Sequence, residues 1–186
     1  MSAPTISVAI LTRNRLPLLR QTVEAVLAQL SDQDEVVVVD TGSSDGTREW
    51  LDALSSHDLR VRWTELDASR TDFGAARNAA VRTARAEVVA FLDDDCLPAP
   101  DWLNHIRVAL TRLDAVGGLA LFGNNYHIPW WWAPQLAWTV GMSGPSLIRG
   151  RIDDYPSTSN MAAWRTQFAA HPFQESAHRF QSAHIY

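Results

Sequence analysis

Short apolar runs alternate with amphipathic segments over the first 113 residues of this chain. Three runs rich in β-branched residues predict buried strands: 5–11 (TISVAIL), 35–40 (EVVVVD) and 87–92 (EVVAFL). The four consecutive valines at 36–39 are typical of a strand in a sheet that is covered on both faces. A fourth strand is predicted at 60–66, and helices are predicted at 16–30, 47–54, 71–84 and 100–113. This alternation predicts an α/β fold, a mostly parallel sheet flanked by helices.

The pattern changes after about residue 114. Further strands are predicted at 115–122 and 159–164, whereas residues 123–156 are rich in Gly, Pro and Trp and show no clear period. We therefore expect an α/β part at 1–122 and a smaller, irregular part of the same domain at 123–186. The second part is expected to be incomplete at its C-terminus.

Charge and cysteine content exclude several classes of function. The chain has 16 basic and 21 acidic residues and a formal charge of −5, which argues against nucleic-acid binding. Cys96 is the single cysteine, so no intrachain disulfide can form and a reducing compartment is expected. Neither a signal peptide nor an apolar run of about 18 residues is present, and we predict a cytoplasmic location.

Polar residues follow the predicted strands where ligands bind in parallel sheets, beyond the carboxyl ends. Thr12 and Arg13 follow the strand predicted at 5–11, Asp40 ends the one at 35–40, and Asp93, Asp94 and Asp95 follow the one at 87–92. Three adjacent carboxylates repel one another, and a divalent cation such as Mg²⁺ or Mn²⁺ would remove that cost. Alternation along an extended segment allows Asp93 and Asp95 to serve one ion together. The alternative is a solvated acidic turn that caps the helix beginning near Asp101.

Four segments in this order resemble those of bacterial family 2 glycosyltransferases of the GT-A fold. They are VAILTRNR (8–15), VVVVDTGSSDGT (36–47), FGAARNAA (73–80) and VVAFLDDDC (88–96). Weaker matches follow at 116–118, 129–131 and 159–165, so the resemblance covers nearly the whole chain. It implies a metal-dependent transferase that moves a sugar from a nucleotide-diphosphate sugar to an acceptor hydroxyl, with inversion at the anomeric carbon, in glycan or glycoconjugate assembly.

The resemblance also implies roles for individual residues. Asp95, with Asp93, would bind Mn²⁺ or Mg²⁺ through the Asp-x-Asp motif, and Asp93 would also meet the ribose. Asp40 would accept a hydrogen bond from a uracil-like imide, which favours a UDP- or dTDP-sugar. The residues expected to bind the nucleotide sugar are Thr12, Arg13, Asp40, Ser43, Arg77, Asp93 and Asp94. Turn formation is an alternative role for Asp40 and Ser43, and a solvated helix face is one for Arg77.

The catalytic base of the family is missing at the expected place. Phe173-Gln174-Glu175 resembles the element that precedes a Glu-Asp pair, yet no acidic residue follows Glu175 before Tyr186. A fragment of a longer protein is the favoured explanation. The alternatives are an inactive, non-catalytic nucleotide-sugar-binding protein, and a different base among Asp153, Asp154 and Glu175.

The acceptor side is expected at Trp130, Trp131 and Trp132, which lie between two prolines. Aromatic faces stack on sugar rings and favour membrane interfaces, so the acceptor would be a glycan, a lipid-linked molecule or a small molecule. Peripheral contact with the inner face of the membrane is compatible with this stretch. Packing of these rings in the second half of the core is the alternative. A dinucleotide-binding oxidoreductase is excluded, because residues 12–17 (TRNRLP) contain no glycine.

Overall fold

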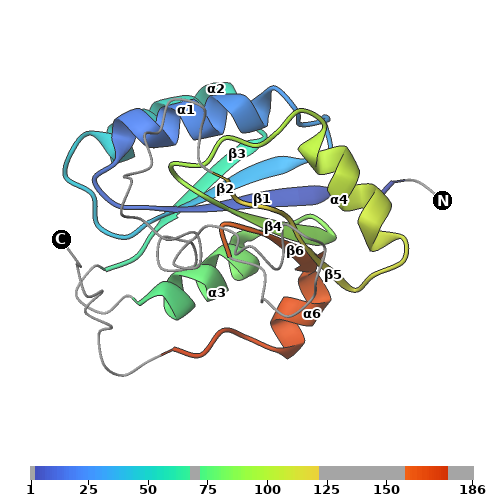
Figure 1. Cartoon of the computed structure of the whole chain (residues 1–186). Helices are drawn as coiled ribbons and strands as arrows, with labels where there is room; N and C mark the ends of the chain where they lie inside the picture. Colours follow the sequence, from blue (N-terminus) through green and yellow to red (C-terminus); the bar gives the residue numbers. More distant parts are fainter. Residues whose placement is uncertain (1–2, 68–71, 122–157, 176–186) are drawn as a thin grey trace, which may run out of the picture.

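The computed structural model describes residues 3–67, 72–121 and 158–175 (Figure 1). The elements within these ranges follow the expected alternation of strand and helix. In chain order they are β1 (Ile6–Thr12), α1 (Leu16–Leu27), β2 (Glu35–Asp40), α2 (Thr47–His57), β3 (Val61–Glu65), α3 (Phe73–Thr83), β4 (Val88–Asp93), α4 (Trp102–Leu110), β5 (Ala115–Gly117), β6 (Asn160–Trp164) and α6 (Arg165–Ala170).

The strands form one mixed sheet in the order β3-β2-β1-β4-β6-β5. β3, β2, β1 and β4 are parallel, and β6 and β5 add an antiparallel edge. The register pairs Thr12 with Asp40 and Leu11 with Asp93. The ends of β1, β2 and β4 therefore lie together at one edge of the sheet.

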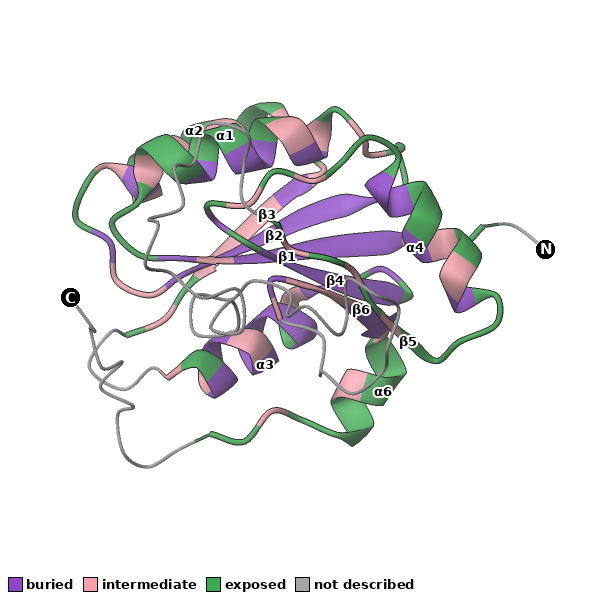
Figure 2. Ribbon diagram, in the orientation of Figure 1, coloured by how far each residue is buried: buried purple, intermediate pink, exposed green. Residues whose placement is uncertain are grey.

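Both faces of the sheet are covered, as the valine run predicts. Val36 and Val38 pack in a core with α1, α2 and α4, whereas Val37 and Val39 pack in a second core with α3. Figure 2 shows the central strands buried along their length, with exposed residues on the outer surfaces of the helices. The alternation of side chains along each strand divides the valines between the two cores.

Most predicted elements agree with the structure to within a few residues, and two details differ. Ser44 and Asp45, before the helix predicted at 47–54, indicate a side-chain cap, but the residue directly before α2 is Gly46, whose φ of 89° is left-handed. Asp45 still accepts hydrogen bonds from the amide and hydroxyl of Thr47. The strand expected at 115–122 ends at Gly117, and beyond it the Asn160 side chain donates a hydrogen bond to the carbonyl of Leu119.

The proposed division at residue 122 stays a prediction, because residues 122–157 lie outside the described part of the chain. Among the helices that the structure describes, none has the length and apolar character needed to cross a bilayer.

Candidate functional site

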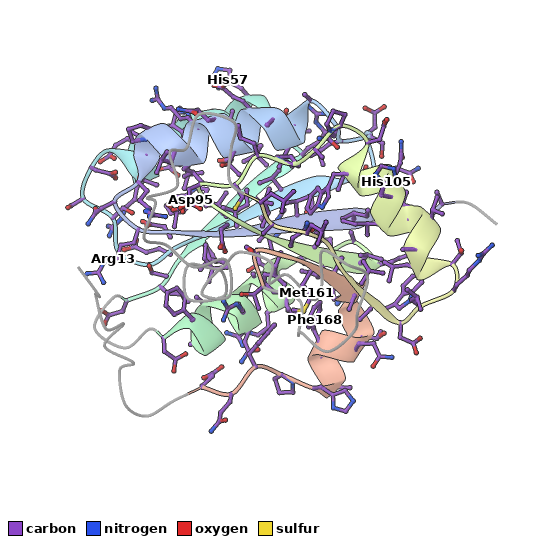
Figure 3. All side chains as sticks on the ribbon, in the orientation of Figure 1. Arg13, His57, Asp95, His105, Met161 and Phe168 are labelled. Atoms are coloured by element: carbon purple, nitrogen blue, oxygen red, sulfur yellow. The ribbon has the colours of Figure 1, made fainter. Side chains whose placement is uncertain are left out.

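The candidate site lies at the carboxyl edge of the parallel strands, where the loops after β1, β2 and β4 meet. Figure 3 shows Arg13 and Asp95 towards the same side of the molecule. Arg13 is exposed in the loop after β1. The side chains that follow these strands come together because parallel strands end at the same edge.

The three aspartates after β4 face different surroundings. Asp93 and Asp95 are exposed, whereas Asp94 between them is buried and only 4% exposed. Ligand atoms of Asp93, Asp95 and Cys96 all lie within 4.8 Å of one another. Two carboxylates with a half-buried thiol at this spacing fit a divalent cation, and their oxygens are donors that suit Mg²⁺ or Mn²⁺.

Asp94 ties the acidic segment to the rest of the fold. Its Oδ2 accepts a hydrogen bond of 2.7 Å from the Thr12 hydroxyl at the end of β1. Its backbone carbonyl accepts one of 3.0 Å from the hydroxyl of Thr22 on α1. Thr12 itself is 4% exposed. The structure therefore places Thr12 and Asp94 in a buried pair, and their contact with a nucleotide sugar stays a prediction.

Arg15 is a site residue that the sequence reasoning did not single out. Its Nη1 lies 2.8 Å from Asp94 Oδ1 and 2.9 Å from Asp95 Oδ2. The hydrogen bond to Asp94 raises the pKa of Arg15, against the opposing effect of burial. The side chain is 48% exposed, so it can move without breaking the core. The sequence signal that could have identified Arg15 is its position in the segment TRNR (12–15), directly after the end of a strand.

The acidic pair carries an electrostatic cost in the absence of a cation. Although Asp93 has accessible surface, the protein packed around it raises the pKa of its carboxyl. Asp95 and Asp94 raise this pKa further, while Arg77 and Arg15 lower it. Burial and the carboxylates of Asp93 and Asp95 raise the pKa of the Cys96 thiol to about 12. Excess negative charge at this corner favours a bound cation.

Asp40 and Ser43 organise the loop after β2. Asp40 is fully buried and accepts hydrogen bonds from the Ser43 amide, at 3.1 and 3.2 Å, and from Arg48 Nε at 3.3 Å. Ser43 Oγ in turn accepts a hydrogen bond of 2.8 Å from the backbone amide of Asn14. The loops after β1 and β2 are thus joined through Ser43. Both residues have turn-forming contacts, and base recognition by Asp40 stays a prediction.

Arg77 does not lie on a solvated helix face. It is half-buried, and its Nη2 donates a hydrogen bond of 2.7 Å to Thr158 Oγ1. Burial lowers the pKa of Arg77, and the nearby carboxylate of Asp93 opposes that effect. The guanidinium is therefore a half-buried cation near the exposed acidic pair, and its contact with an anionic group of a ligand stays a prediction.

Of the three candidate bases, the structure describes Glu175. This residue is exposed, and its Oε1 accepts a hydrogen bond of 2.8 Å from Asn78 Nδ2 on α3. Asp153 and Asp154 lie outside the described residues, and so do Trp130, Trp131 and Trp132. No role of these residues is tested by the structure.

Comparison with known proteins agrees with the fold and shows the family. The model of glycosyl transferase family 2 matches residues 7–172. The succinoglycan biosynthesis protein ExoO of Rhizobium meliloti is 36% identical over 114 residues, which are 61% of this chain and 31% of that protein. The chain covers less than two fifths of the length of the curated relatives that it matches.

Two solved structures share the fold. The mannosyltransferase PcManGT from Pyrobaculum calidifontis, in complex with GDP-Man and Mn²⁺, has a TM-score of 0.65 at 23% identity, covering 95% of this chain and 49% of that one. The structure of S. aureus TarS residues 1–349 has a TM-score of 0.68 at 17% identity, and the match covers 96% of this chain and 52% of that one. These likenesses confirm the GT-A fold, and the family match over most of the sequence settles the classification: the chain belongs to glycosyl transferase family 2.

Proposed function

We propose that this protein binds a nucleotide-diphosphate sugar together with Mn²⁺ or Mg²⁺ and transfers the sugar to an acceptor hydroxyl, with inversion, in glycan assembly. The observation that carries the proposal is the exposed pair Asp93 and Asp95 at the end of β4, with ligand atoms within 4.8 Å of each other. GDP-Man with Mn²⁺ is bound to PcManGT, and UDP-GlcNAc is bound to TarS, which supports a nucleotide-sugar donor.

Asp93, Asp94, Asp95 and Arg77 each have a function in this proposal. Asp93 and Asp95 hold the cation, which when bound neutralises charge on the departing diphosphate. Arg77, half-buried near Asp93, adds a fixed positive charge that faces the phosphates. The buried Asp94 keeps the two neighbouring carboxylates turned outward through its contacts with Thr12 and Arg15.

The acceptor hydroxyl needs a base on the face opposite the leaving group. Glu175 is the described candidate, and Asp153 and Asp154 are the others. Trp130, Trp131 and Trp132 are proposed to contact the acceptor, which would be a glycan, a lipid-linked molecule or a small molecule. We further propose that the protein works in the cytoplasm, with the inner face of the membrane as a site of contact.

Calorimetric titration of a panel of nucleotide sugars, with and without Mn²⁺, tests which donor binds and whether its binding needs the metal. We expect a UDP- or dTDP-sugar to bind best, and to bind only with the metal. Equal binding without metal would contradict the proposal. Detection of sugar transfer, or of metal-dependent donor hydrolysis, then separates a transferase from a protein that only binds nucleotide sugars.

A further inference from the structure

Residues 173–175 are held along α3 by one buried side chain, that of Asn78. Asn78 is 7% exposed, and its Nδ2 donates to the Phe173 carbonyl at 2.9 Å and to Glu175 Oε1 at 2.8 Å. Its Oδ1 accepts a hydrogen bond of 2.9 Å from the Phe173 amide. One amide side chain thus binds a segment that is 95 to 97 residues away in the sequence.

Gly74, one helical turn before Asn78, allows the segment to approach α3 closely. A Cβ atom at this position would lie 2.1 Å from the carbonyl oxygen of Gln174. Figure 1 shows the chain after α6 running back along α3. The helix face formed by Gly74 and Asn78 is therefore shaped for residues 173–175.

Phe173 connects this segment to the candidate donor site. Its ring packs edge-on against Phe91, with centroids 5.5 Å apart, and Phe91 precedes Asp93 by two residues in β4. The guanidinium carbon of Arg77 lies 5.5 Å from the centroid of Phe173 and 5.6 Å from that of Phe73. Arg77 is thus held between two aromatic rings, in addition to its hydrogen bond with Thr158.

We propose that Asn78 is a positioning residue of the donor site: it fixes residues 173–175 on α3, so that Phe173 holds the Arg77 guanidinium near Asp93. The inference rests on the proposed function, in which Arg77 meets the diphosphate. An arginine held in place before the ligand arrives loses less side-chain freedom on binding, so its contact with an anion is stronger. Loosening the segment therefore weakens nucleotide binding without removing any group that touches the nucleotide.

The test measures the affinity of the 186-residue chain for UDP in the presence of Mn²⁺ by calorimetry. Asn78→Asp replaces the donating Nδ2 with an oxygen that repels Glu175 and the Phe173 carbonyl. We expect the dissociation constant to rise about tenfold, as for partners that orient a binding group. Asn104→Asp is the matched control, because Asn104 is exposed on α4 and its Oδ1 accepts from Arg107 in either form.

The double variant Asn78→Asp with Glu175→Gln separates positioning from a general loss of folding. The amide that Glu175→Gln introduces can donate to the new carboxylate at position 78, so the double variant is expected to recover part of the lost affinity. Phe173→Leu keeps apolar bulk but removes the ring beside Arg77, and it is expected to weaken binding to a similar degree. This variant tests the inference even where Asn78→Asp does not fold.

Three results would overturn the inference while the donor-site function stands: wild-type affinity in Asn78→Asp, a loss that Glu175→Gln does not relieve, or wild-type affinity in Phe173→Leu. Failure of the wild-type chain to bind any nucleotide diphosphate with metal would instead reject the proposed function, and this inference with it.

Discussion

The hydroxyl of Thr12 donates a 2.7 Å hydrogen bond to the buried carboxylate of Asp94, joining the end of β1 to the residue that follows β4. This contact gives the middle aspartate a different function from its two neighbours. With Asp94 turned into the protein, Asp93 and Asp95 are left on the exposed side. The acidic triplet therefore combines a structural anchor with a candidate metal site.

Stability is expected to distinguish Asp94 from Asp95. Asp94→Ala leaves the buried Thr12 hydroxyl without its acceptor and removes an ion pair with Arg15, so a loss of about 1–3 kcal/mol in the free energy of unfolding is expected. Asp95→Ala removes a side chain that is 41% exposed, and a change below about 0.5 kcal/mol is expected. Urea unfolding of the metal-free variants measures both. Equal losses would contradict this division of roles.

Arg15 is expected to compete with a divalent cation for Asp95. Arg15→Gln removes the positive charge 2.9 Å from Asp95 Oδ2. Because exposed ion pairs contribute up to about 1 kcal/mol, Mn²⁺ should bind about fivefold more tightly. Titration of Mn²⁺ followed by electron paramagnetic resonance measures this affinity. Arg20→Gln, a change on α1 beside Trp50, serves as control. Weaker Mn²⁺ binding in Arg15→Gln would show that Arg15 supports the carboxylates rather than competing with the ion.

Asp34 lies just before β2, at the edge of the sheet opposite the candidate site, and is expected to make the stability of the protein depend on pH. Burial alone would raise the pKa of Asp34, but hydrogen bonds from Ser31, Arg107 and the Ile6 amide outweigh it and lower the pKa. Because the pKa of Asp34 is lower in the folded than in the unfolded protein, its charge stabilises the fold. This stabilisation is fully present above the pKa of the unfolded state, about 3.9, and is lost as the pH falls through the pKa of the folded state.

The variant Asp34→Asn tests this pH dependence. It removes the charge, and its side-chain NH₂ group would face the N–H donors of Ser31, Arg107 and Ile6 that now bind the carboxylate. At pH 5 the variant should be less stable than the wild type by about 1–3 kcal/mol. Denaturant unfolding between about pH 5 and pH 3 should show this difference shrinking below about pH 3.9. A difference that is constant across this range would contradict the contribution of the Asp34 charge.

Gly74→Ala is expected to displace residues 173–175 from α3. The new methyl group would lie 2.1 Å from the Gln174 carbonyl oxygen, so the two backbones must separate. Hydrogen exchange of the Phe173 amide should become faster, since the hydrogen bond that it donates to Asn78 Oδ1 lengthens. Ala75→Gly, at the next position of the helix, is the control for changed helix propensity. Unchanged exchange in Gly74→Ala would mean that the segment tolerates the shift.

The sequence predicted the sheet well, because its signals are local. The valine run of β2 and the apolar run of β4 are too continuous for half-exposed strands, and the structure buries both. Alternation along the chain also predicted that Asp93 and Asp95 share a side. The same reasoning could not assign Asp94, because its partners Thr12 and Arg15 lie 82 and 79 residues away.

Contacts between distant segments account for the other features that the sequence did not predict. Asn78 is an ordinary polar residue in an alanine-rich helix until residues 173–175 are seen beside it. Arg77 was equally compatible with a solvated face, and its position between Phe73 and Phe173 depends on the same long-range packing. Local patterns specify the elements, whereas such pairings arise only when the elements pack.

Anomalous diffraction from crystals grown with Mn²⁺ and UDP tests the central claim most directly, since it locates the ion without a model of its ligands. The account predicts a manganese peak in contact with the Asp95 carboxylate, next to Asp93 and the diphosphate. A nucleotide bound with no manganese at Asp93 or Asp95, or a manganese ion held elsewhere, would contradict it.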